Sequence, residues 1–156
     1  QNWEKIKAEE RKENGNAHKN GMLDGIPLAL PALTQADQIQ RRAQRIGFDW
    51  KTIEPVIAKV NEELEELLKA HTTEERQAEG GDLLFAVVNL LRWLEIDPET
   101  ALRECNLRFR QRFAFIEAAA ADQGKSVDAL SFEQMDALWE QAKQALKDQD
   151  QEEETA

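Results

Sequence analysis

Two short acidic motifs are the residues of this sequence best suited to chemistry. Glu63-x-x-Glu66 lies within a run of four glutamates, and Glu79-x-x-Asp82 directly precedes six apolar residues, LLFAVV. Side chains three positions apart share one side of an α-helix. Carboxylates without an accompanying histidine form an all-oxygen ligand set, which suits Mg²⁺ or Mn²⁺. The two motifs therefore predict a site for a hard divalent cation.

A simpler explanation exists for part of this pattern. A run of glutamates is commonly a solvated helix face, and Glu79 could belong to a capped surface turn. Asp82 does not fit that explanation, because an apolar segment follows it at once and a buried, unpartnered carboxylate costs several kcal/mol. Other metal sites fail: neither His18 nor His71 follows a glutamate by three positions, and Cys105 is the single cysteine.

Helical periodicity distinguishes the glutamates of the run from one another. Glu63 borders the apolar stripe of its helix, and Glu66 lies one turn further on the same side. Glu62 is predicted to point away from the core and Glu65 toward the opposite flank. On the next helix the acidic pair shares its flank with Asn89. Two antiparallel helices joined by a short turn would bring the two acidic pairs face to face.

A later helix carries the opposite charge. Arg108 and Arg112 are four positions apart and share a face, and guanidinium groups bind phosphate oxygens through paired hydrogen bonds. Taken alone, these arginines are better explained as a solvated face. Beside a magnesium site they indicate a metal-bound polyphosphate. Trp50, on a connector, could stack on a base, although such a tryptophan more often packs against the core; Trp139 and Lys143 are weaker candidates.

The elements that position these residues are predicted to be helices throughout. The 156 residues are rich in helix formers, and no segment alternates like a strand. We expect helices at 31–46, 52–70, 73–94, 97–123 and 131–147. The start signals are Pro31, Thr52, Thr73, the Asp97–Pro98 pair, and Ser131 with Gln134. The sequence thus predicts an all-α bundle of four to six helices.

The bundle is expected to occupy residues 31–147. Residues 1–30 read as a charged helical lead-in followed by a flexible linker, and residues 148–156 as an acidic disordered tail. The helix at 73–94 is apolar on nearly every side from Leu83 to Leu94, and such a helix must be surrounded. Four or five helices of one chain barely cover it. We therefore expect a homodimer that completes the bundle.

Composition restricts the partners and the compartment. The net charge of −11 disfavours stable nucleic-acid binding, and no apolar run approaches the length that spans a membrane. One cysteine and no signal peptide favour the cytoplasm. The chain begins with Gln1 in a charged helical stretch, which suggests a piece of a longer protein.

The motifs together resemble those of the MazG nucleoside triphosphate pyrophosphohydrolases. Twelve residues separate Glu63-x-x-Glu66 from Glu79-x-x-Asp82, and LLFAVVN follows. Further matches are IPLALPAL at 26–33, IGFDW at 46–50 and NLRFRQRF at 106–113. WEKIKAEER at 3–11 resembles the linker between the two domains of longer members. The resemblance extends to about Lys143, and it is to the C-terminal domain of a two-domain member.

The resemblance implies an all-α homodimer that hydrolyses NTPs and dNTPs to monophosphate and pyrophosphate with Mg²⁺. It implies tolerance of different bases and a house-cleaning role in the nucleotide pool. By position, the magnesium ligands are Glu63, Glu66, Glu79 and Asp82. The implied substrate contacts are Lys59, Arg108 and Arg112 on phosphates, Asn89 and Asn106 in support, and Trp139 against the base.

Two departures and two alternatives stay open. Gly80-Gly81 replaces the usual large residue and glycine, and Arg108 stands where many members have lysine.

The chain could be a selective all-α pyrophosphatase, for dUTP or phosphoribosyl-ATP. It could also be a non-catalytic dimerisation module, although the intact carboxylate set argues against that. Either Glu63 or Glu66 could serve as the general base.

Overall fold

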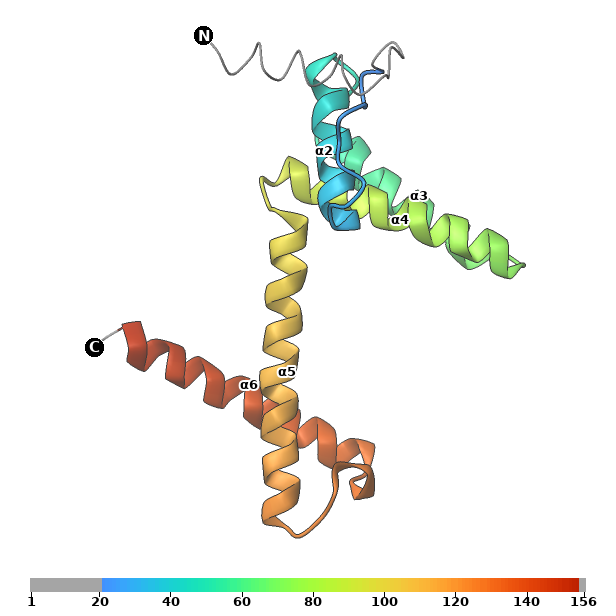
Figure 1. The fold of residues 1–156 in the computed structure, drawn as a ribbon. Coiled ribbons are helices and arrows are strands. Elements are labelled where there is room, and N and C mark those ends of the chain that lie inside the picture. Colours follow the sequence, from blue (N-terminus) through green and yellow to red (C-terminus); the bar gives the residue numbers. More distant parts are fainter. Residues whose placement is uncertain (1–20, 155–156) are drawn as a thin grey trace. The chain divides into compact units, whose positions relative to one another are not determined.

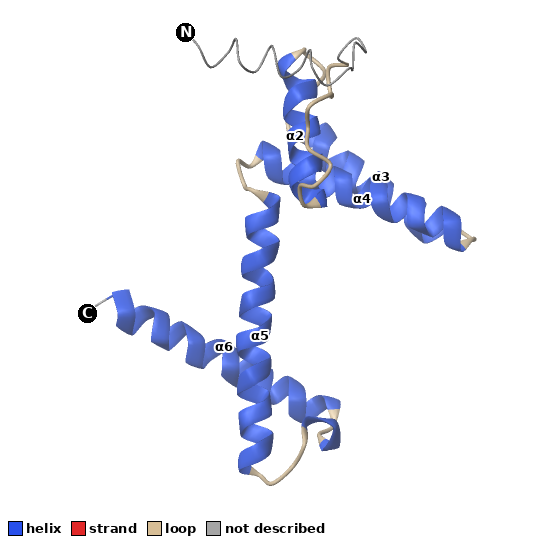
Figure 2. Ribbon diagram, viewed as in Figure 1, coloured by secondary structure: helices blue, strands red, loops and turns tan. Residues whose placement is uncertain are grey.

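The computed structural model describes residues 21–154, and within that range every element is a helix (Figures 1 and 2). The elements are α2 (Ala32–Arg45), α3 (Glu54–Lys69), α4 (Thr73–Trp93), α5 (Pro98–Asp122), the 3₁₀ helix η1 (Val127–Ala129) and α6 (Phe132–Glu154). The all-α prediction is confirmed. The predicted lead-in helix and the part of the predicted linker before residue 21 lie outside the described residues.

The described chain divides after Glu99 into two compact units, where the sequence predicted a single helical domain over 31–147. In the first unit, α3 and α4 form a hairpin through the turn at 70–72, and α2 packs against α4 (Figure 1). Val56 of α3 and Val88 of α4 are buried in this unit. The hairpin therefore supplies the face-to-face arrangement that the acidic motifs require.

The start of α4 is fixed by a capping box one residue earlier than predicted. Thr72, not Thr73, is the N-cap residue: its hydroxyl accepts a hydrogen bond from the Glu75 backbone N–H at 3.1 Å. The Glu75 carboxylate in turn accepts the Thr72 N–H at 3.1 Å and the His71 N–H at 2.8 Å. Both adjacent threonines satisfy the N-cap rule, and only Thr72 has a glutamate three positions later.

Two other predicted starts were also displaced. Thr52 does not cap α3, which begins at Glu54 with Ile53 as its N-cap and Pro55 in its first turn. Proline's fixed φ angle suits the first helical turn, and this signal was stronger than that of the threonine. Pro31 is the N-cap of α2 rather than its first helical residue, since its ψ angle is extended. These differences do not move the acidic motifs off their helices.

The second unit consists of α5 from Thr100 onward, η1 and α6. Its core contains Ile116 and Leu130, with Trp139 packed against them. The predicted capping box at Ser131 is confirmed, because Ser131 N–H donates to Gln134 Oε1 at 2.9 Å and Gln134 N–H to Ser131 Oγ at 3.3 Å.

The end of α6 differs from the prediction. The helix continues to Glu154, so the backbone of 148–154 is helical where an acidic disordered tail was expected. The segment contains glutamines and glutamates and no glycine or proline, so nothing in it stops a helix.

Large apolar side chains remain uncovered on the α3–α4 hairpin. Leu68 and Leu84 are 77% and 60% exposed, and Phe85 is exposed as well. This exposure agrees with the inference that one chain cannot surround α4, while homodimerisation itself stays a prediction. Among the described residues no helix is both long and apolar enough to cross a membrane.

Candidate metal centre

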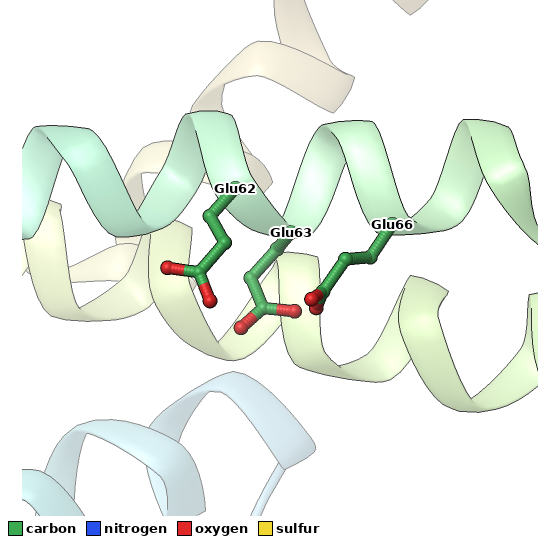
Figure 3. Close-up of side chains that lie close together, drawn as sticks. All are labelled: Glu62, Glu63 and Glu66. Atoms are coloured by element: carbon green, nitrogen blue, oxygen red, sulfur yellow. The ribbon is translucent and has the colours of Figure 1, made fainter.

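The α3–α4 hairpin gathers five carboxylates into an acidic cluster. Oxygens of Glu62, Glu63 and Glu66 lie within 4.8 Å of one another (Figure 3), and so do oxygens of Glu63, Glu79 and Asp82. Glu63 belongs to both groups and is only 5% exposed. The cluster is therefore centred on Glu63, and it contains the four acids that the spacing of the motifs singled out.

The positions of two members differ from those inferred from periodicity. Glu62 was predicted to point away from the core, yet its carboxylate joins the cluster, because three side-chain torsions let it fold back along α3. Asp82 was expected to be buried, and within this one chain it is exposed. Glu65 takes no part in the cluster and pairs with Lys69 on the surface, as its predicted direction implied.

Lys59 is the cation that α3 itself supplies to the cluster. Its Nζ lies 2.6 Å from Glu63 Oε1 and 2.9 Å from Glu62 Oε1. The hydrogen bonds to Glu62 and Glu63 raise the pKa of Lys59 well above its ordinary value, so the ammonium is charged at any physiological pH. Part of the cluster's negative charge is therefore balanced within the helix.

The other carboxylates of the cluster act on Glu66. Desolvation, followed by repulsion from Glu63, Glu79 and Glu62, raises the pKa of the exposed Glu66, and Lys59 opposes the shift. Five carboxylates around one ammonium group form an oxygen-only donor set with excess charge. Such a set fits a hard divalent cation such as Mg²⁺ or Mn²⁺.

A cavity of about 810 Å³ adjoins the cluster within the first unit. Glu63 and Asp82 line it, together with Lys59 and Asn89, and Trp50 adds an aromatic surface. Apolar side chains form much of the remaining wall, including Met22, Ile39, Phe48 and Phe85. A volume of this size is typical of small-molecule sites, and the wall combines charge at the cluster with an apolar remainder.

A buried arginine, missed in the sequence, ties the connector 46–50 to α4 at the wall of this cavity. The Nη2 group of Arg92 donates to Asp49 Oδ1 at 2.7 Å and to Asn89 Oδ1 at 2.7 Å, and its Nε donates to Asn89 Oδ1 at 3.0 Å. The Arg92 side chain is 4% exposed. The signal available in the sequence was an arginine inside an apolar run, three residues after the asparagine that ends the motif LLFAVVN.

The same network determines the charge state of Asp49. Burial acts to raise the pKa of this carboxyl, but hydrogen bonds from Arg92 and the Trp50 backbone outweigh it and leave the pKa below its ordinary value. Trp93 Nε1 adds a longer contact at 3.4 Å. Asp49 and the buried Arg92 thus form an ion pair that holds the connector carrying Trp50.

The other predicted substrate contacts belong to the second unit. The Arg112 guanidinium lies 5.3 Å from the ring centroid of Trp139, and the Phe109 ring packs against that tryptophan at 5.0 Å. Arg112 Nε is buried and without a hydrogen-bond partner among the described residues. Arg108 and Asn106 are exposed. The structure thus groups Arg112 with Trp139, and it groups Lys59, Trp50 and Asn89 in the first unit.

Sequence comparison finds related proteins that cover most of this chain. It is 42% identical over 141 residues to a Thermotoga maritima protein named nucleoside triphosphate pyrophosphohydrolase/pyrophosphatase MazG, and 41% identical over 150 residues to the Escherichia coli K12 nucleoside triphosphate pyrophosphohydrolase. Each match covers 90% of the chain and 54% of the relative. A Bacillus subtilis protein, uncharacterized protein YabN, is 40% identical over 147 residues, which cover 92% of the chain and 29% of that protein.

The chain spans about half the length of the first two relatives, and the match lies in their C-terminal half. No family model matches the chain.

Proposed function

The chain is a homologue of the MazG nucleoside triphosphate pyrophosphohydrolases, related to their C-terminal half, and on this premise we propose that it hydrolyses nucleoside triphosphates. Its substrates are NTPs and dNTPs, and its products are the monophosphate and pyrophosphate. The observation that carries the proposal is the acidic cluster beside a cavity large enough for a nucleotide. Removal of unwanted nucleotides from the pool is the corresponding role.

We assign Mg²⁺, with Mn²⁺ as a substitute, to Glu63, Glu66, Glu79 and Asp82. Glu62 is an additional ligand candidate that only the structure brought to light. The excess negative charge around Glu66 supports this assignment. When bound, the metal supplies charge neutralisation for the triphosphate and orients the attacking water.

The residues of the chain have separate tasks in the proposed reaction. Water attacks the α-phosphorus, the bond from that phosphorus to the α,β-bridging oxygen breaks, and pyrophosphate leaves. Either Glu63 or Glu66 accepts the proton of the water. Lys59, already charged at the edge of the cluster, contacts a phosphate oxygen, and Trp50 offers a stacking surface for the base. These tasks place the phosphates at the cluster and the nucleoside in the cavity.

Roles for the residues of the second unit come from the resemblance. Arg108 and Arg112 neutralise phosphates, Asn106 supports the site and Trp139 lies against the base. The contact between Arg112 and Trp139 supports their acting together, and the unpartnered Arg112 Nε leaves a donor that a phosphate oxygen could use.

We also infer that the active protein is a homodimer, because Leu68, Leu84 and Phe85 are exposed on the hairpin that carries the cluster. Light scattering on the purified chain tests this inference: a mass of one chain at micromolar concentration would contradict it. The cytoplasmic location predicted from the single cysteine remains a prediction.

Pyrophosphate release from a panel of NTPs and dNTPs, with and without Mg²⁺, tests the function. We expect release that depends on the metal and is lost in Glu66→Ala. Glu65→Ala is the matched control, since Glu65 is exposed and outside the cluster, and it should retain activity.

Other outcomes of the same panel favour the alternatives. Hydrolysis of dUTP or of phosphoribosyl-ATP alone would indicate a selective pyrophosphatase. A folded dimer that releases no pyrophosphate from any nucleotide would indicate a non-catalytic dimerisation module.

A further inference from the structure

The side-chain amide of Asn89 has a fixed orientation because of what contacts it. Its Oδ1 accepts two hydrogen bonds from Arg92, from Nε at 3.0 Å and from Nη2 at 2.7 Å. A guanidinium group has donors and no acceptor, so only the amide oxygen can face Arg92. The NH₂ group is therefore the polar group that Asn89 has left to offer to a ligand.

Arg92 is itself held so that it cannot easily release Asn89. Its Nη2 also donates to Asp49 Oδ1 at 2.7 Å, and its side chain is 4% exposed. Releasing either partner would leave a buried charge without compensation, which is costly. The connector at Asp49 thus fixes Arg92, and Arg92 fixes the amide.

Asn89 lies at the wall of the cavity in line with the acidic cluster. Asp82 and Asn89 are seven positions apart on α4, close to two turns, so they share one side of the helix about 10 Å apart along its axis. Both line the cavity. A nucleotide whose phosphates lie at Asp82 can reach Asn89 through this cavity, which Trp50 and Phe85 also line.

We propose that the Asn89 NH₂ group donates a hydrogen bond to the nucleobase, and that Arg92 is the positioning residue that fixes this donor. Every natural base carries acceptor atoms on its edges, ring nitrogens or carbonyl oxygens, so one fixed donor can serve different bases. This inference rests on the proposed hydrolysis of nucleoside triphosphates. It assigns a base contact to the first unit and a positioning role to the buried Arg92.

The decisive variant is Asn89→Asp. Aspartate keeps an oxygen for both Arg92 hydrogen bonds and adds an ion pair, while it replaces the NH₂ donor by a second acceptor. We expect the melting temperature of Asn89→Asp to be unchanged or higher. We expect its KM for each of four dNTPs to be about 10-fold higher, because a lost hydrogen bond that leaves an acceptor unpaired has an effect of this size. If Asn89 only braces Arg92, the KM values will not change.

Substrate arms separate the base from the sugar and the phosphates. Abasic 2′-deoxyribose 5′-triphosphate has the sugar and the phosphates but no base. Its KM should therefore be the same for the wild-type protein and for Asn89→Leu, whereas the KM for dATP should be higher for Asn89→Leu. Equal increases for both compounds would overturn the base assignment. Gln44→Glu is the control for the charge that Asn89→Asp adds, because it makes the same amide-to-acid change at an exposed position of α2 outside the cavity.

Arg92→Lys tests the positioning role. Lysine keeps a cation for Asp49 and lacks the fork that reaches Asn89. We expect calorimetry with α,β-methylene-dATP and Mg²⁺ to show weaker binding by about 5-fold, and the added effect of Asn89→Leu to be smaller in this background than in the wild-type protein. Fully additive effects would overturn the role of Arg92.

Failure of this inference is distinguishable from failure of the proposed function. A chain that hydrolyses dNTPs while Asn89→Asp leaves every KM unchanged contradicts the inference alone. A chain that neither hydrolyses nor binds any nucleotide contradicts the proposed function.

Discussion

Lys59 Nζ lies 2.6 Å from Glu63 Oε1, so the most buried acid of the cluster is paired with a cation from its own helix. One turn of α3 separates the two residues, and the pair lies at the wall of the cavity. The lysine and a divalent metal ion both seek the Glu63 carboxylate. A bound metal would therefore displace the ammonium, which is then available to a phosphate of the substrate.

The first prediction follows from this competition. Lys59→Met should tighten Mn²⁺ binding by the resting protein, because one competing cation is removed, and should lower kcat/KM for dATP by about 10-fold, because a phosphate contact is lost. Calorimetry and steady-state kinetics measure the two effects. Lys69→Met, which removes a surface lysine paired with Glu65, is the control. A parallel decrease in metal affinity and in activity would contradict the competition.

The second prediction concerns the ion pair between Asp49 and the buried Arg92. Asp49→Asn removes one charge and leaves Arg92 buried with a neutral partner. Breaking such a pair costs about 3 kcal/mol, so the free energy of unfolding should fall by about that amount at pH 7. Urea denaturation measures it, and Asp24→Asn, at a site in the 21–24 turn, is a comparison in which no such loss is expected.

The pH dependence of that loss is the third prediction. The pKa of Asp49 is lowered in the folded protein from the ordinary value of 3.8, so this carboxyl contributes stability above pH 3.8. That contribution decreases as the pH falls through the lower folded pKa, where Asp49 becomes protonated in the native state too. The difference in unfolding free energy between the wild-type protein and Asp49→Asn should therefore shrink below pH 3.8. A difference that stays constant down to pH 2 would contradict the assignment.

The sequence predicted the helices well because each carries its own periodic stripe and stop signals. The sequence also predicted that the two acidic pairs face each other. Residues three apart on α3 and on α4 share a side of their helix, and the short turn at 70–72 makes the two helices neighbours. Which of two adjacent threonines caps α4 was decided by Glu75, three positions after Thr72. That reciprocal pair was readable in the sequence and was overlooked.

Other features depended on contacts that local patterns do not encode. The bond between Arg92 and Asp49 joins residues 43 positions apart, and only the fold brings them together. Glu62 was misplaced because periodicity fixes where a Cβ points and not where a long side chain ends. The division into two compact units after Glu99 could not be predicted, because α5 is continuous from Pro98 to Asp122 and gives no linker signal. The single domain over 31–147 stays a prediction.

The fourth prediction concerns the glycine that departs from the family pattern. A Cβ added at Gly80 would meet nothing within 4 Å, and its φ angle is helical, so alanine fits there. Gly80→Ala should raise the free energy of unfolding by about 1 kcal/mol, since glycine is costly inside a helix. Thermal denaturation measures this effect. An unchanged or lower melting temperature would show that Gly80 is needed for an approach that a single chain does not display.

The last prediction tests the capping box that begins α4. Thr72→Ala removes the hydroxyl that accepts the Glu75 N–H, while Thr73→Ala changes a residue already inside the helix. Loss of an N-cap costs about 1 kcal/mol, so Thr72→Ala should lower the melting temperature and Thr73→Ala should change it little. Because the first turn of α4 leads directly to Glu79, fraying there should also weaken Mn²⁺ binding in Thr72→Ala. Equal effects of the two substitutions on stability and on metal binding would contradict the assignment of the N-cap to Thr72.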